Sequence, residues 1–168
     1  MTLTTAEVWD AIANDGMFGV LASVNRRGEA RSVGVIYVTH ERSLLISTAR
    51  DTWKVRHIAA NPNVSMTITF PKRVPFLPFI RIPAATITFS GTAEILDVPD
   101  APFEATRKLL RGLDFEGEPM EDHVIIRVTP RGDFVTYGIG MPITQMRSPE
   151  KARDRVPSGT TVNEPTTA

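Results

Sequence analysis

The spacing of hydrophobic positions changes from a helical to a strand period after the first fifteen residues. Thr4 and Glu7 have the spacing of a capping box. Three apolar residues then recur near one helical face: Val8, Trp9 and Ile12. The pattern predicts a helix that opens at Thr4 and ends at the turn signal Asn14–Gly16.

Seven segments further along the chain have the composition or alternation of strands, and short polar turns or predicted helices separate most of them. They are Phe18–Val24, Arg31–Thr39, Leu44–Thr48, Val64–Phe70, Ala84–Leu96, Val124–Val128 and Phe134–Tyr137. The first three predict an antiparallel meander, and the last two predict a hairpin around Pro130–Asp133. Gly91 lies within a strand pattern, which predicts a bulge or a close backbone approach.

Two more helices are predicted, one over 52–60 with Asp51 as its cap and one over about 101–110. With few helices and no β-α-β alternation, the fold class expected is mainly β, a small antiparallel barrel with peripheral helices. We expect one domain over 1–146. The polar segment 147–168 has no aromatic residue and three prolines, which predicts a flexible C-terminal tail.

The segment Phe70–Pro83 carries four prolines among bulky apolar residues, so it is predicted to be neither helix nor strand. An apolar loop of this length needs a covering surface. We expect it to pack on its own barrel, on a partner chain, on a membrane surface that its basic residues Lys72, Arg73 and Arg81 would favour, or over a ligand pocket. In the last case Phe76 and Phe79 form the wall of a substrate site.

The composition of the chain excludes several classes of function. Nineteen basic and nineteen acidic residues give no net charge, which argues against a nucleic-acid-binding protein. The chain has no cysteine, and its three histidines lack metal-ligand spacing, so no metal site is expected. Neither a membrane-spanning stretch nor a secretory signal is visible, so a cytoplasmic location is expected.

Between Arg50 and Pro83 there are six basic residues and one acid, Asp51. Within this region Thr48 to Lys54 has the pattern of a strand end followed by a helix start. Helix N–H groups, a lysine and a threonine hydroxyl together make a phosphate site. The structural alternative is an ordinary solvated helix start.

Several of these features together resemble the pyridoxamine 5′-phosphate oxidase-like family of flavin- or deazaflavin-binding split barrels. The resemblance covers about Thr4 to Tyr137. The residues that carry it are Gly19–Val24, Gly28, Val33–Val38, Leu45–Thr48, Lys54 and Asn61–Ser65. It implies a six-stranded Greek-key split barrel, a homodimer, and a cofactor site in the dimer interface.

By this resemblance Lys54 and Thr48 hold the phosphate of FMN, and Ser47 lines the same site. The strand Val33–Val38, with Val33, Gly34 and Val35, runs along the flavin ring. The oxidase has arginines where this chain has Val33 and Trp53. Arg31, on the same strand face as Val33, can substitute for the first arginine, and Arg50 or Arg56 can substitute for the second. Thr52 and Trp53, next to Lys54, are also expected in the cofactor site.

The oxidase also has a glutamine where this chain has Thr86, and its C-terminal Trp and Arg have no match here. The resemblance therefore implies a divergent member rather than an enzyme that oxidises pyridoxamine phosphate. Its expected activity is FMN-dependent oxidoreduction of an apolar or planar small molecule. The alternatives are a reductase that uses coenzyme F-420, a non-catalytic flavin-binding protein, and a barrel without cofactor. Tyr37 is the best side-chain candidate near the ring, against the simpler interpretation of a core tyrosine.

Overall fold

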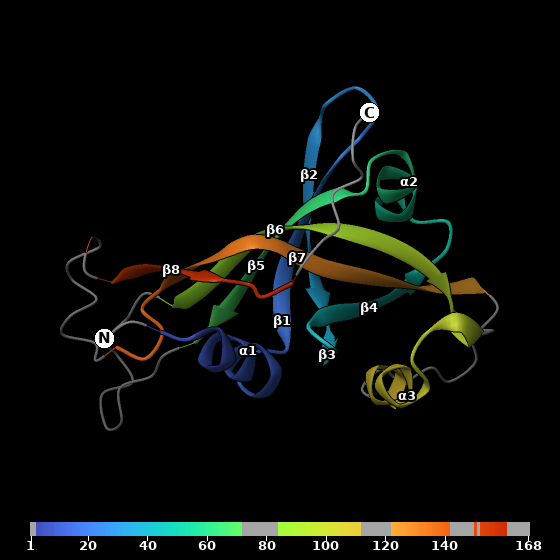
Figure 1. Cartoon of the computed structure of the whole chain (residues 1–168). Helices are drawn as coiled ribbons and strands as arrows, with labels where there is room; N and C mark the ends of the chain where they lie inside the picture. Colours follow the sequence, from blue (N-terminus) through green and yellow to red (C-terminus); the bar gives the residue numbers. More distant parts are fainter. Residues whose placement is uncertain (1–2, 72–83, 112–121, 142–149, 151, 161–168) are drawn as a thin grey trace, which may run out of the picture.

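A computed structural model describes residues 3–71, 84–111, 122–141, 150 and 152–160 (Figure 1). Three helices are present in these ranges: α1 (Thr5–Asn14), α2 (Trp53–Ala60) and α3 (Phe103–Arg111). The strands are β1 (Phe18–Val24), β2 (Ala30–Ile36), β3 (Val38–His40), β4 (Ser43–Ala49), β5 (Asn63–Phe70), β6 (Ala85–Asp97), β7 (His123–Tyr137) and β8 (Arg153–Pro157). A short 3-10 turn, η1 (Val98–Asp100), precedes α3. None of the helices in these ranges has the length and apolar character needed to cross a membrane.

All strands belong to one antiparallel sheet in the order β2-β1-β5-β6-β7-β4-β3, and β8 pairs with β7. The two outermost strands, β2 and β3, are consecutive in the chain, with only Tyr37 between them. A flat sheet cannot place consecutive residues at its opposite edges. The sheet therefore curls into a half-barrel, which confirms the expected mainly-β split-barrel fold.

The predicted three-stranded meander is wrong in one respect. The segment 31–39 forms two strands, β2 paired with β1 and β3 paired with β4. β2 and β3 therefore do not form one continuous strand in the middle of the sheet. They are its two edge strands, and the curling of the sheet brings these two edges together at Tyr37. The alternation of side chains is the same in both arrangements, so the sequence pattern could not distinguish them.

The predicted hairpin at Pro130–Asp133 is also wrong, because β7 runs unbroken through it. Gly132 has a φ of +68°, and the register between β6 and β7 shifts between Thr88 and Ser90. The turn-like sequence therefore forms an irregularity that bends one long strand. The expectation for Gly91 is confirmed, since a Cβ on it would lie 2.6 Å from the carbonyl oxygen of Thr129.

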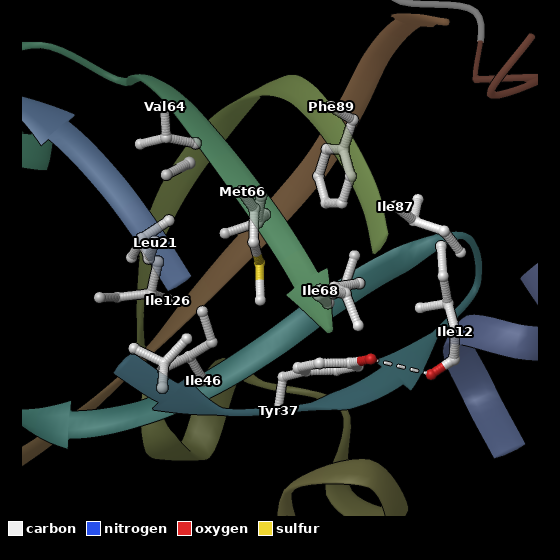
Figure 2. Close-up of a cluster of buried hydrophobic side chains, with 14 of the residues drawn as sticks. Ile12, Leu21, Tyr37, Ile46, Val64, Met66, Ile68, Ile87, Phe89 and Ile126 are labelled. Atoms are coloured by element: carbon white, nitrogen blue, oxygen red, sulfur yellow. Dashed lines mark hydrogen bonds between the residues drawn. The ribbon is translucent and has the colours of Figure 1, made fainter. Parts of the chain in front are cut away.

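The interior of the half-barrel is one apolar cluster (Figure 2). The predicted alternation of β5 is confirmed: Val64, Met66, Ile68 and Phe70 are buried. The capping box of α1 is also confirmed, since Thr4 N donates to Glu7 Oε2 at 2.7 Å and Glu7 N donates to Thr4 Oγ1 at 3.3 Å. Val8 and Ile12 of that helix close one end of the cluster.

The prediction of a flexible tail does not hold for residues 152–160. Strand β8 extends the sheet beside β7, with Val156 buried. Trp9 Nε1 donates to the carbonyl oxygen of Ser158 at 2.9 Å, and the Trp9 ring meets Phe134 edge-on. Backbone pairing with β7 and contact with α1 hold this polar segment in place. The expected boundary at 146 lies outside the described residues.

Candidate cofactor-binding site

Strand β4 leads within three residues into α2, and this junction is the candidate site. Thr52 is the N-cap of α2, one residue later than the Asp51 that the sequence suggested. The Thr52 side chain makes no capping hydrogen bond, and its Oγ1 lies 3.4 Å from Thr48 Oγ1. The first-turn N–H groups of α2 therefore have no capping side chain. They and the two hydroxyls are donors for an anion.

Lys54 lies in the first turn of α2, partly buried, and makes no ion pair with any residue the structure describes. Burial lowers the pKa of its ammonium group below the ordinary value. A partly desolvated cation without a counter-charge is an unfavourable arrangement that a bound anion relieves. The residues present thus fit a phosphate group.

Strand β2 brings a second cation to this junction. Arg31 lies over the ring of Trp53, with its guanidinium carbon 5.7 Å from the ring centroid. Strand periodicity puts Arg31, Val33 and Val35 on the same face of β2. Val35 is buried in the core and Val33 packs against it, so Arg31 ends an apolar row.

The remaining features of β2 suit a flat ligand. In the described part of the chain it pairs only with β1, so the backbone groups along its other edge have no strand partner. These groups are donors and acceptors for a planar ring. Gly34 lies on the opposite face, where a Cβ would come within 2.7 Å of the Phe18 ring. Gly34 therefore serves packing between β1 and β2.

Other predicted residues are placed elsewhere. Ser47 and Thr48 are adjacent strand residues, so they point to opposite faces, and it is the Thr48 hydroxyl that lies beside the N-cap residue Thr52. The Ser47 hydroxyl is buried and has no hydrogen-bond partner among the residues that the structure describes. Arg50 forms an ion pair with Asp97, with 2.7 Å between Nη2 and Oδ1, so its charge already has a partner. Their cofactor roles stay predictions.

Tyr37 is 3% exposed and belongs to the core (Figure 2). Its hydroxyl donates to the Ile12 carbonyl oxygen at 3.0 Å. Burial raises the pKa of this hydroxyl above its ordinary value. These observations favour the core interpretation over a role in proton transfer. Phe76 and Phe79 lie outside the described residues, and their role as a substrate-site wall stays a prediction.

His57, one of the three histidines without metal-ligand spacing, also lies in this region. His57 Nδ1 lies 3.2 Å from Ser23 Oγ, and the His57 ring meets the Trp53 ring edge-on at 5.0 Å. Trp53 and His57 are four residues apart on a helix, so their shared face follows from the spacing. Nothing local indicated that Ser23 of β1 would lie opposite.

The family model for pyridoxamine 5′-phosphate oxidase matches residues 5–132. The chain belongs to this family. The match includes β1 to β6, all three helices and the first part of β7, and with them the whole candidate site. None of the curated proteins matches the sequence.

Three solved structures that resemble this chain are named for different ligands. An F420 reductase is 23% identical, with 74% of this chain and 94% of that chain covered and a TM-score of 0.57. A FAD-binding protein from Mesorhizobium loti is 20% identical, with 78% and 92% covered and a TM-score of 0.61. HutZ, a heme storage protein from Vibrio cholerae, is 15% identical, with 82% and 98% covered and a TM-score of 0.61. These likenesses show the fold.

Proposed function

We propose that the protein is a flavin-dependent oxidoreductase that binds FMN with its phosphate at the start of α2. One observation carries the proposal: a helix start without a capping side chain lies beside Lys54, a partly buried cation with no ion-pair partner among the described residues. The family match supports a flavin, and the names of two similar structures include FAD and F420.

The residues of the site then have separate tasks. Lys54, the first-turn N–H groups of α2 and the Thr48 and Thr52 hydroxyls hold the phosphate. The outer edge of β2 orients the ring, and Val33 and Val35 provide an apolar surface that excludes water. A bound flavin supplies two-electron transfer, so the protein's contribution is binding and orientation. The substrate proposed is an apolar or planar small molecule.

The deciding experiment is the absorbance spectrum of the purified protein, with mass spectrometry of whatever denaturation releases. Flavin bands and a mass of FMN are expected. If the protein is colourless, titration with FMN should raise its melting temperature. Reduction of the bound flavin by a two-electron donor and its reoxidation by a substrate would establish the enzyme. A protein that neither contains nor binds FMN contradicts the proposal.

The second candidate is a reductase that uses coenzyme F-420 at the same phosphate anchor. It is favoured by the basic composition of the chain between Arg50 and Pro83, because this coenzyme has an anionic tail. Thermal stabilisation by F-420 and not by FMN would support it. Stabilisation by FMN alone would exclude it.

We also propose a homodimer. Three large hydrophobic side chains are exposed close to one another: Met17, Phe18 and Ile36. Met17 and Phe18 are consecutive in the chain, and Phe18 is paired with Ile36 across β1 and β2. Obligate homodimers bury about 2,000 Å² or more, and exposed apolar side chains of this kind would form the central part of such an interface. Light scattering should report twice 18.5 kDa. Ile36→Glu should weaken the dimer, and Phe103→Glu, at another exposed position, should not.

A further inference from the structure

A hollow of about 460 Å³ lies between the β1–β2 turn and the second half of α2. It is lined by three arginines, Arg26, Arg27 and Arg56, by Asn25 and His57, and by two alanines of α2. Within the described ranges, no acidic side chain lines it. We call it the basic hollow. Lys54, which lies in the first turn of α2, is not among its lining residues.

The turn that carries Arg26 and Arg27 is held by its own hydrogen bonds. Asn25 Oδ1 accepts from the backbone N–H of Arg27 at 2.8 Å and of Glu29 at 3.0 Å. Gly28 has a φ of +81°, and its N–H donates to the Asn25 carbonyl oxygen. These bonds use backbone groups and the Asn25 side chain, so the two guanidinium groups are presented from a fixed turn and are not needed to hold it.

The positive charge of the basic hollow is not neutralised within the described part of the chain. Arg26, Arg27 and Arg56 form no ion pair there, and Arg56 donates one N–H to the backbone carbonyl oxygen of Asp51. Glu29, the acid of the turn, is engaged by Asn25 Nδ2 at 2.6 Å and does not line the hollow. The chain as a whole has zero net charge, so the three arginines are a local excess of positive charge. A bound anion would reduce the repulsion between them.

His57 adds a directed group. Its Nδ1 lies within hydrogen-bond distance of the hydroxyl of Ser23, which is 3% exposed. This buried contact fixes the orientation of the His57 ring. Its Nε2 has no partner in the described residues and is left to bond a ligand.

A helix C-terminus attracts cations, and this alone could explain Arg56 and His57. It does not explain Arg26 and Arg27, which belong to a different element and still line the same hollow. We propose that the basic hollow is a second anion site. It takes a small anion with two or more negative charges, such as a phosphate ester or pyrophosphate group, because guanidinium groups bind such oxygens with paired hydrogen bonds.

The test uses the full chain labelled with ¹⁵N and titrated with inorganic pyrophosphate at constant ionic strength. We expect amide resonances of residues 25–28 and 56–60 to shift with saturation. The double variant R27Q/R56Q should bind at least tenfold more weakly. R155Q, which removes an exposed arginine of β8, should stay within twofold of the wild type. Lys54→Ala should leave the shifts at 25–28 in place, because it removes only the other anchor.

Two results would overturn the proposal: no shift at residues 25–28 with pyrophosphate, or equal affinity of R27Q/R56Q and the wild type. The second result, with a changed melting temperature, would assign the arginines to stability alone. Because pyrophosphate reports on the basic hollow directly, a failure of FMN binding bears on the proposed function and not on this site.

The source of the anion is decided by comparing FMN with the dinucleotide FAD. Trp53 and His57 are about 6 Å apart along the axis of α2, so one extended ligand can reach from the anchor to the hollow. If R27Q/R56Q loses tenfold affinity for FAD and none for FMN, the hollow takes the distal phosphate of an anchored ligand. If only pyrophosphate binding falls, it takes a separate molecule. Both results support the site.

Discussion

At the scale of single residues, Lys54 is expected to bind the phosphate, and its partial burial destabilises the ligand-free protein. Burial disfavours its charge, so Lys54→Met removes a desolvation cost in the absence of ligand. We expect the melting temperature of the ligand-free protein to stay within about 2 °C of the wild type or to rise. The affinity for FMN should fall roughly ten- to a hundredfold, as expected for a lost charge-assisted phosphate contact. Lys108→Met, at an exposed position of α3, is the matched control and should change neither.

The lowered pKa of Lys54 also gives binding a pH dependence. The lysine is charged below its folded pKa and neutral above it, and only the charged form attracts the phosphate. FMN affinity should therefore decrease as the pH rises through this lowered pKa. Titrations between neutral and alkaline pH measure the decrease. In Lys54→Met it should be absent, and a decrease of equal size there would assign the effect to another group.

A substitution of Tyr37 can distinguish a structural role of this residue from a catalytic one. Tyr37→Phe leaves the Ile12 carbonyl oxygen without its donor in the core, which should cost about 1–3 kcal/mol of unfolding free energy in urea denaturation. Reduction of a bound flavin should continue at the rate of the wild type. Loss of that rate in a variant of unchanged stability would return Tyr37 to the catalytic candidates.

At the scale of elements, the close approach of β6 and β7 depends on Gly91. Gly91→Ala places a Cβ against the backbone of Thr129, which no side-chain rotation relieves. We expect a loss of about 1–3 kcal/mol, typical of overpacking, measured by urea denaturation. Ser90→Ala, at an exposed position of the same strand, should stay within about 0.5 kcal/mol of the wild type. Equal stabilities of the two variants would mean that the strands separate without cost.

At the scale of the whole molecule, β8 connects the end of the chain to its beginning. Besides the Trp9 hydrogen bond, Thr5 Oγ1 donates to the Pro157 carbonyl oxygen and Leu3 N to Asp154 Oδ2. A chain ending at Met146 should therefore melt well below one ending at Thr160, which keeps β8. Calorimetry of the two chains measures the difference. Equal melting temperatures would show that β8 adds no stability.

The same scale explains how much of the candidate site was predictable. The strand-to-helix step at Thr48–Lys54 is local, so its sequence indicated a phosphate site, and the structure places Thr48, Thr52 and Lys54 together there. The partners that come from elsewhere were not predictable in the same way. Asp97 pairs with Arg50, and Ser23 with His57, across strands that are distant in the chain.

The sequence by itself determined the elements whose causes are local: the capping box of α1, the alternation of β5 and the glycine that allows β6 to approach β7. Only the tertiary structure decided that residues 31–39 serve both edges of the sheet, that Pro130–Asp133 continues a strand, and that the polar residues 153–157 form β8. The physical reason is that a strand is stabilised by backbone hydrogen bonds to distant partners. Side-chain alternation reports which face is buried and carries no information about which strand lies alongside.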